Sequence, residues 1–244
     1  MLNERIAFIT GANGGIGKGI INSLIKEKIK IIYAVRKKDK NFLNYVSKNR
    51  KYIIEVLEFD LNNENETKKQ IFSLYKKYKK IDFLINNAGI ASGALFEMTS
   101  IKNLKNIFEI NFFSQIRITQ LLLRLLKKSK NASIINIGSI TGIIPEKGTM
   151  AYGSSKSALM FSTKVMANEL ALYNIRVNAL APNVVKTKML KLMSEKSKND
   201  LISQSFLNRV CSTKDISELV IFLCSDKSSY INGQILKLNG GMKI

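Results

Sequence analysis

The sequence predicts an α/β fold, with one doubly wound domain in which a seven-stranded parallel sheet is covered by helices on both faces. Short apolar runs alternate with longer amphipathic segments, as in consecutive right-handed strand–helix–strand units. The apolar runs are nearly continuous, which is typical of strands buried on both faces. The expected strands cover residues 5–10, 30–35, 52–59, 81–86, 133–138, 175–180 and 234–238, and the expected helices cover residues 15–27, 64–79, 101–128, 151–173 and 212–224.

The bulk properties agree with a single domain spanning residues 1–244, because no linker, repeat or low-complexity tract interrupts the pattern. No apolar run approaches the roughly 20 residues of a membrane span. No signal peptide is expected, since Glu4 and Arg5 precede the first strand and no small-residue cleavage site follows. Only Cys211 and Cys224 are present. Two widely spaced cysteines favour a reducing compartment, so we expect a cytoplasmic protein.

The formal net charge of +21 does not by itself indicate a nucleic-acid partner. Lysine is spread along the whole chain, whereas a nucleic-acid-binding protein concentrates its basic residues on one face or tail. We therefore expect neither nucleic-acid nor membrane binding. The charge could still attract an acidic partner by long-range steering.

A glycine-rich turn follows the first expected strand. The stretch TGANGGIGKG at residues 10–19 contains Gly11, Gly15 and Gly17 before a helical segment. Glycine lets the backbone approach a ligand closely, and a helix N-terminus favours a pyrophosphate. The turn could instead bind nothing, but a strand before it and a helix after it favour a Rossmann-type dinucleotide site.

The residues after the second strand bear on which dinucleotide is bound. Val35 is followed by Arg36, Lys37 and Lys38, with no carboxylate to hold the adenosine ribose of NAD. A guanidinium pairs with a phosphate through two hydrogen bonds, so Arg36 favours the 2′-phosphate of NADP. The two lysines could equally be solvated charges.

Five motifs occur in a fixed order: TGANGGIG at 10–17, NNAG at 86–89, Asn111 in a long helix, Ser139 after a strand, and YGSSK at 152–156. Together they resemble the short-chain dehydrogenase/reductase family from about residue 5 to the end. The chain length, the stretch SDKSSYINGQ and the closing NGGMKI are most similar to the β-ketoacyl-acyl-carrier-protein reductases.

The resemblance implies a catalytic role for each of four residues. Tyr152 is the general acid in reduction, and Lys156 lowers its pKa and binds the nicotinamide ribose. Ser139 binds the substrate carbonyl, and Asn111 distorts its helix and holds a water in a proton relay. The residues implied to bind NADP(H) are Gly11, Asn13, Gly15, Ile16, Gly17, Arg36, Asp60, Leu61, Asn87, Ala88, Gly89, Tyr152, Lys156, Pro182, Val185 and Thr187.

The chemistry supports the tyrosine–lysine pair independently. Free tyrosine has a pKa of about 10, which a nearby ammonium and the nicotinamide's positive charge would lower. Residues four apart share one face of a helix, so Tyr152 and Lys156 can point into one site. The chain has no histidine, which removes Ser–His hydrolase chemistry and His-based metal sites, and we expect no metal.

The expected activity is NADPH-dependent reduction of a ketone to a secondary alcohol, with 3-oxoacyl-acyl-carrier-protein as the first candidate substrate. A related reductase acting on another carbonyl compound is the alternative, and a non-catalytic binding protein is a distant third. A variable lid at about residues 188–209 should decide between the first two. The resemblance also implies a homotetramer, or otherwise a homodimer.

Some positions depart from the reductases' pattern. Gly14 stands where a basic residue often binds the 2′-phosphate, which leaves more of that role to Arg36. Lys130 matches one of the family's positions for docking the acidic acyl carrier protein, and Tyr173 occupies another.

Overall fold

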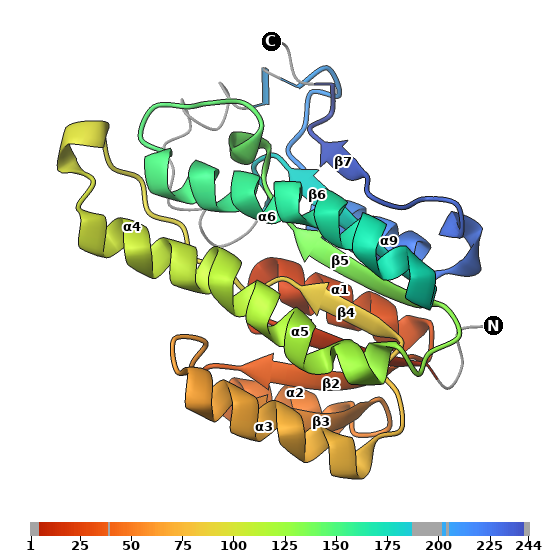
Figure 1. Cartoon of the computed structure of the whole chain (residues 1–244). Coiled ribbons are helices and arrows are strands. Elements are labelled where there is room, and N and C mark those ends of the chain that lie inside the picture. The colour runs from red at the N-terminus through yellow and green to blue at the C-terminus, as the bar shows by residue number, and fades with distance from the viewer. Residues whose placement is uncertain (1–4, 39, 187–201, 204, 242–244) are drawn as a thin grey trace.

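The computed structural model describes residues 5–38, 40–186, 202–203 and 205–241. Its centre is a seven-stranded sheet in the order β3-β2-β1-β4-β5-β6-β7, and every pair of neighbouring strands is parallel. The predicted fold class is therefore confirmed (Figure 1). The strands are β1 (Ile6–Thr10), β2 (Lys30–Val35), β3 (Ile53–Glu58), β4 (Phe83–Asn86), β5 (Ala132–Ile137), β6 (Ile175–Pro182) and β7 (Ile235–Leu238).

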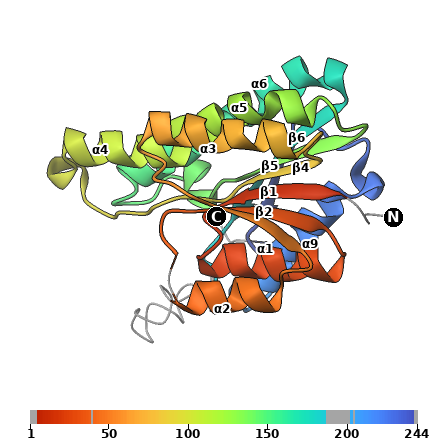
Figure 2. The ribbon, with the colours of Figure 1, turned by 90° about the horizontal axis from the view of Figure 1, so that it is seen from below.

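Helices cover both faces of the sheet. Figure 2 shows α3, α4, α5 and α6 on one face and α1, α2 and α9 on the other. None of the described helices is both long and apolar enough to span a bilayer. Their bounds are α1 (Gly15–Lys26), α2 (Lys40–Lys48), α3 (Glu64–Lys77), α4 (Ile101–Phe108), α5 (Ser114–Leu126), α6 (Met150–Leu170) and α9 (Thr213–Cys224).

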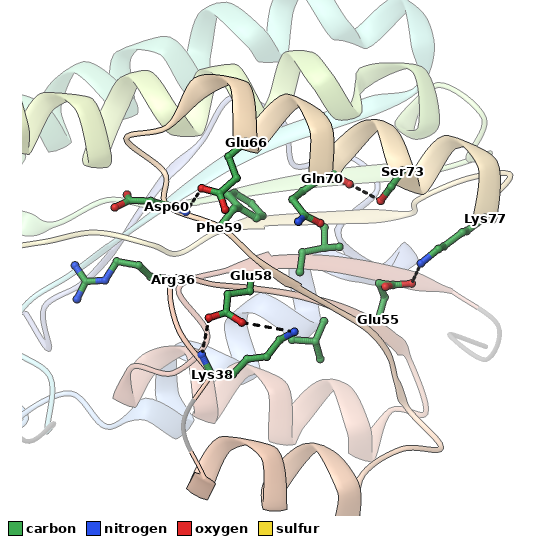
Figure 3. Close-up of a pocket in the computed structure, with 12 residues that line it drawn as sticks. Arg36, Lys38, Glu55, Glu58, Phe59, Asp60, Glu66, Gln70, Ser73 and Lys77 are labelled. Atoms are coloured by element: carbon green, nitrogen blue, oxygen red, sulfur yellow. Dashed lines mark hydrogen bonds and ion pairs between the residues drawn. The ribbon is translucent and has the colours of Figure 1, made fainter.

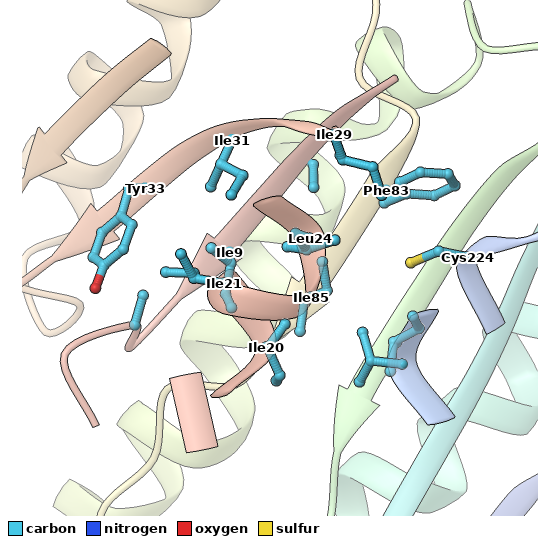
Figure 4. Close-up of a cluster of buried hydrophobic side chains, with 14 of the residues drawn as sticks. Ile9, Ile20, Ile21, Leu24, Ile29, Ile31, Tyr33, Phe83, Ile85 and Cys224 are labelled. Atoms are coloured by element: carbon cyan, nitrogen blue, oxygen red, sulfur yellow. The ribbon is translucent and has the colours of Figure 1, made fainter. Parts of the chain in front are cut away.

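Each face of the sheet has its own hydrophobic core, because alternate side chains of a strand point to opposite faces. Within β1, Ile9 packs toward α1 and α9, whereas Phe8 packs toward α3 and α5. The first of these cores contains Ile20 and Leu24 from α1 (Figure 4). Burial on both faces explains why the strands read as continuous apolar runs.

Two helical predictions need correction. Helix α2 was not predicted, because its sequence is short and polar, and tertiary contact stabilises it: Phe42 is 3% exposed and its ring lies 4.9 Å from that of Tyr33. The single helix expected over 101–128 is divided, since a π-helical segment, η2 (Glu109–Phe113), separates α4 from α5.

The strand order places the candidate site. The chain runs from β1 outward to β3 and then returns to place β4 on the other side of β1. Ligands of such sheets bind beyond the carboxyl ends of the strands where the order reverses. Here those ends belong to β1 and β4, with β5 beside them, and the predicted motifs follow directly after these strands.

Candidate functional site

The glycine turn after β1 packs tightly against the segment that follows β4. Gly11 has φ +64°, and a Cβ at this position would lie 2.5 Å from the Cα of Ala88, so only glycine fits. Helix α1 begins at Gly15 without a side-chain cap and without an acidic residue in its first turn. Its first N–H groups and its partial positive charge can therefore receive a pyrophosphate.

The hydroxyl of Thr10 holds these two segments together. Its Oγ1 accepts hydrogen bonds from the backbone N–H of Asn87 at 3.1 Å and of Ala88 at 3.0 Å. The Asn87 amide donates back to the carbonyls of Thr10 and Gly11, both at 2.9 Å. The predicted cofactor-lining residues Asn87 to Gly89 are thus fixed against the glycine turn.

The other predicted residues of the turn act mainly through the backbone. Ile16 turns its side chain to the core, and a Cβ on Gly17 would lie 2.6 Å from the Cα of Ala12. The Asn13 side chain accepts from the Tyr33 hydroxyl and donates to the Lys37 carbonyl, each at 3.2 Å. These bonds brace the turn against β2 and the residues after it.

A groove of about 620 Å³ runs along the edge strand β3 and helix α3, and Arg36 and Asp60 line its end beyond the carboxyl ends of β2 and β3 (Figure 3). Arg36 is exposed and forms no hydrogen bond or ion pair with any residue that the structure describes. Lys38 is engaged, because its ammonium lies 3.7 Å from the Glu58 carboxylate and its N–H donates to the same group at 3.4 Å. Of these two cations, Arg36 is the one available to a phosphate.

Ser139 and Tyr152 come together through a close contact between a turn and a helix. Ser139 follows β5 and caps a short 3-10 helix, η3 (Ile140–Gly142), with its Oγ 2.9 Å from Thr141 Oγ1. Tyr152 lies in the first turn of α6. A Cβ on Gly153 would lie 2.7 Å from the Thr141 carbonyl oxygen, so glycine allows α6 to approach the turn that carries Ser139.

Burial dominates the pKa values of the catalytic pair. Burial lowers the pKa of Lys156 to about 8, and its Nζ donates to the Ile137 carbonyl at 2.7 Å. Burial raises the pKa of Tyr152 above its ordinary value, and a hydrogen bond with Ser139 offsets this only in part. The Lys156 Nζ lies 5.9 Å from the centroid of the tyrosine ring.

These directions differ from the sequence-based expectation that Lys156 lowers the pKa of Tyr152. The reason is that both groups are largely removed from water, which disfavours the tyrosinate and the ammonium alike. The lowering expected from the positive charge of a nicotinamide stays a prediction.

Asn111 lies in the π-helical segment, as the expected local distortion of its helix requires. It is completely buried, and its amide exchanges hydrogen bonds of 2.8 and 2.9 Å with the backbone of Ile90. It also donates to Ser155 Oγ at 3.0 Å. A Cβ on Gly89 would lie 3.2 Å from both Asn111 Oδ1 and Lys156 Nζ, so Gly89 lies close against both side chains.

The remaining predicted residues lie on two opposite sides of the site, after β6 and after β3. Pro182 ends β6, and Val185 pairs with Cys211 in an isolated parallel bridge. Leu61 follows Asp60, and its carbonyl accepts from Arg117 at 3.5 Å. Thr187 and most of the predicted lid at 188–209 lie outside the described residues.

Sequence reasoning missed two polar residues that join the site together. One is Thr10, whose hydroxyl is described above, and the other is Gln115, which is completely buried. The available signal was spacing, because Gln115 stands four residues after Asn111 and so shares its helix face.

Comparison with known proteins places the chain in a family. A family model described as enoyl-(acyl carrier protein) reductase matches residues 11–243. The 3-oxoacyl-(acyl-carrier-protein) reductase of Thermotoga maritima is 30% identical over 244 residues, covering 100% of this chain and 99% of the relative. The enzyme of the same name from Buchnera aphidicola subsp. Baizongia pistaciae is 34% identical over 241 residues, covering 98% and 97%.

Solved structures agree. Cj0485 dehydrogenase superposes with a TM-score of 0.91 at 30% identity, covering 98% of this chain and 94% of the other. Aldohexose dehydrogenase of Thermoplasma acidophilum, in ligand-free form, superposes with a TM-score of 0.87 at 27% identity over the same shares. With its Asn111, Ser139, Tyr152 and Lys156 gathered beside a glycine turn fit for a nicotinamide dinucleotide, the chain belongs to the short-chain dehydrogenase/reductase family of oxidoreductases.

Proposed function

We propose that the protein reduces a ketone to a secondary alcohol with NADPH, and that its substrate is a 3-oxoacyl group carried by acyl carrier protein. The observation that carries the proposal is the convergence of Ser139, Tyr152 and Lys156 beside Gly89. The two relatives named as 3-oxoacyl-(acyl-carrier-protein) reductases support the choice of substrate.

A bound nicotinamide would supply the hydride, and the chain's own residues would do the rest. Ser139 would donate its hydroxyl proton in a hydrogen bond to the substrate carbonyl oxygen, where negative charge develops. Tyr152, kept neutral by burial, would give its phenolic proton to that oxygen. Lys156 would stabilise the resulting tyrosinate. Asn111, which donates to Ser155, would support the delivery of a new proton to Tyr152.

An alternative substrate is a different carbonyl compound, such as a sugar. The observation in its favour is the overlap with an aldohexose dehydrogenase, whose TM-score is 0.87. The residues expected to choose between these substrates belong to the segment 188–209, so the choice depends on direct assay.

The decisive assay follows NADPH oxidation with an acetoacetyl thioester and with a panel of other ketones and sugars. The thioester should give the highest kcat/KM. Tyr152→Phe should abolish turnover with every substrate while dinucleotide affinity stays nearly unchanged, because only the donated proton is lost. Lys156→Ala should impair both turnover and affinity. Near-normal turnover by Tyr152→Phe would refute the proposed mechanism.

Cofactor choice should depend on Arg36, whose guanidinium is free while Lys38 is paired with Glu58. Replacing Val35 and Arg36 by Asp and Ile should move preference from NADPH toward NADH. A hydrogen bond to a charged group contributes about 1.5–3 kcal/mol, so NADPH affinity should fall roughly 10- to 150-fold. Arg50→Asp, which changes the net charge by the same two units at an exposed position after α2, is the control and should leave both affinities unchanged. Equal use of NADPH and NADH by the unmodified enzyme would contradict this role.

The depressed pKa of Lys156 predicts opposite responses of activity and stability to alkali. As pH rises through about 8, the ammonium is lost and the rate of reduction should fall. The unfolded chain keeps this proton up to pH 10.5, so between about 8 and 10.5 the unfolded state binds more protons and the free energy of unfolding rises.

Chemical unfolding of the wild type and of Lys156→Met across this range isolates the effect, because other titrating groups are common to both. The wild type should gain about 3 kcal/mol relative to the variant. A constant difference between the two proteins, or a kcat that is flat up to pH 10, would show that Lys156 does not titrate in this window.

We also propose a homotetramer in the cytoplasm that docks an acidic acyl carrier protein. Of the apolar residues of α5, Leu122 and Leu125 lie in the core and are not available to a subunit interface. What remains exposed includes Phe161 at 70%, Phe113 at 50% and Val165 at 41%. A closed two-fold assembly would bury such a surface.

Two cations at the end of α5 would face the acidic carrier protein. Lys130 is exposed directly after α5, and the ammonium of Lys127 lies 3.4 Å from the centroid of the Tyr173 ring.

Phe161→Glu should disrupt this assembly and lower activity, because α6 carries both the interface and Tyr152. Phe72→Glu is the control, since Phe72 is also half exposed but lies on α3. Light scattering at micromolar concentration should show a tetramer, or a dimer, for the wild type and for Phe72→Glu. Phe161→Glu should give a smaller species. A fully active wild-type monomer would contradict the proposal.

A further inference from the structure

A buried glutamine joins three separate segments of the site. Gln115 lies in the first turn of α5, directly after the π-helical segment, and is 0% exposed. Its Oε1 accepts from the Thr10 hydroxyl at 3.3 Å. Its Nε2 donates to the Ala88 carbonyl at 3.2 Å and to the Ile110 carbonyl at 3.0 Å. One amide therefore contacts the end of β1, the segment after β4 and the π-helical segment.

The direction of each of these bonds is fixed by chemistry. Carbonyl oxygens only accept, so the nitrogen of the Gln115 amide must face Ala88 and Ile110. The Thr10 oxygen already accepts from Asn87 and Ala88, which leaves its own proton for Gln115 Oε1. Both amide protons and the threonine proton are used, and a fully satisfied buried network of this kind is rigid.

Gln115 and Asn111 act on either side of Gly89. They stand four residues apart on one helix face. Asn111 binds both backbone groups of Ile90, and Gln115 binds the carbonyl of Ala88. The residues before and after Gly89 are therefore each held by an amide at the point where Gly89 passes Lys156.

The same side chain stabilises the distortion that places Asn111. A π-helical turn widens the helix, and such turns are frequent at functional sites. Two side chains donate to carbonyls of this turn: Ser114 to Glu109, and Gln115 to Ile110. Without these donors the π-helical turn would be less stable, and Asn111 would lose its position.

We propose that Gln115 is a positioning residue of the reductase: it fixes the π-helical turn, and with it Asn111 and residues 88–90, relative to Lys156. This inference rests on the proposed function. Gln115 acts through its neighbours and touches neither substrate nor cofactor in this proposal.

The test compares Gln115→Met with Asn178→Leu. Met has nearly the same shape as Gln but no donor. Asn178 is an equally buried amide that donates to the Ile231 carbonyl at 2.9 Å and accepts from the N–H of Gln234 at 3.0 Å, on the side of β6 and β7. Both variants should unfold at lower temperature than the wild type.

Only Q115M should lose catalysis. Misplacement of a catalytic constellation by about 1 Å can lower the rate 100-fold, so we expect kcat to fall roughly 10- to 100-fold. Dinucleotide affinity should fall less than kcat, since Thr10 still accepts from Asn87 and Ala88 and keeps this segment against the glycine turn. Hydrogen exchange of the amides at 88–91 should be faster in Q115M and unchanged in N178L.

Gln115→Glu provides a second variant if Q115M does not fold. It keeps the shape and the acceptor for Thr10, but even a carboxyl that burial keeps protonated has one donor for the two carbonyls of Ala88 and Ile110, so a loss of kcat is still expected. A normal kcat in a folded Q115M or Q115E, or an equal loss of kcat in N178L, would overturn the proposal. If the wild type reduces no ketone, the proposed function fails, whereas the comparison of hydrogen exchange still tests the positioning role.

Discussion

The site depends on the close contact between the turn after β1 and the segment after β4. A side chain on Gly11 would collide with the backbone of Ala88 at 2.5 Å, and the Thr10 hydroxyl binds the N–H groups of Asn87 and Ala88 across the same gap. Because the backbones touch here, the pyrophosphate-binding turn and the Gly89 segment cannot move independently. Ser139, Tyr152 and Lys156 are placed separately, by β5 and α6, and Gly89 is where their side of the site meets this contact.

Burial then sets the chemistry that the site favours. Removal from water raises the pKa of Tyr152 and lowers that of Lys156, so each group resists charging. A neutral tyrosine is a proton donor, which is the form that reduction of a carbonyl requires. Lys156 remains largely protonated below pH 8. The site's own groups thus present the tyrosine in the form that the proposed reduction needs, and the positive charge of an oxidised nicotinamide would lower the pKa of Tyr152.

Charge distribution matters more here than the total of +21. In the groove between β3 and α3, Lys38 pairs with Glu58 and Lys77 lies 2.8 Å from Glu55, whereas the carboxylates of Asp60 and Glu66 accept from backbone N–H groups. Arg36 stands at the same groove without an ion pair to any described residue. Arg36 is thus the cation of this groove that no described carboxylate neutralises, and this is the local feature on which the proposed NADP preference rests.

The sequence by itself determined the α/β class and the seven strands, because hydrophobic periodicity is a local feature of the chain, and the order of its motifs predicted Asn111, Ser139, Tyr152 and Lys156 as site residues. Tertiary structure decided the rest. Packing on Tyr33 made a helix of residues 40–48, and carbonyl partners from distant segments gave Gln115 its place in the site. The directions of the pKa shifts also needed the fold, since spacing brings Lys156 near Tyr152 but only packing removes both from water.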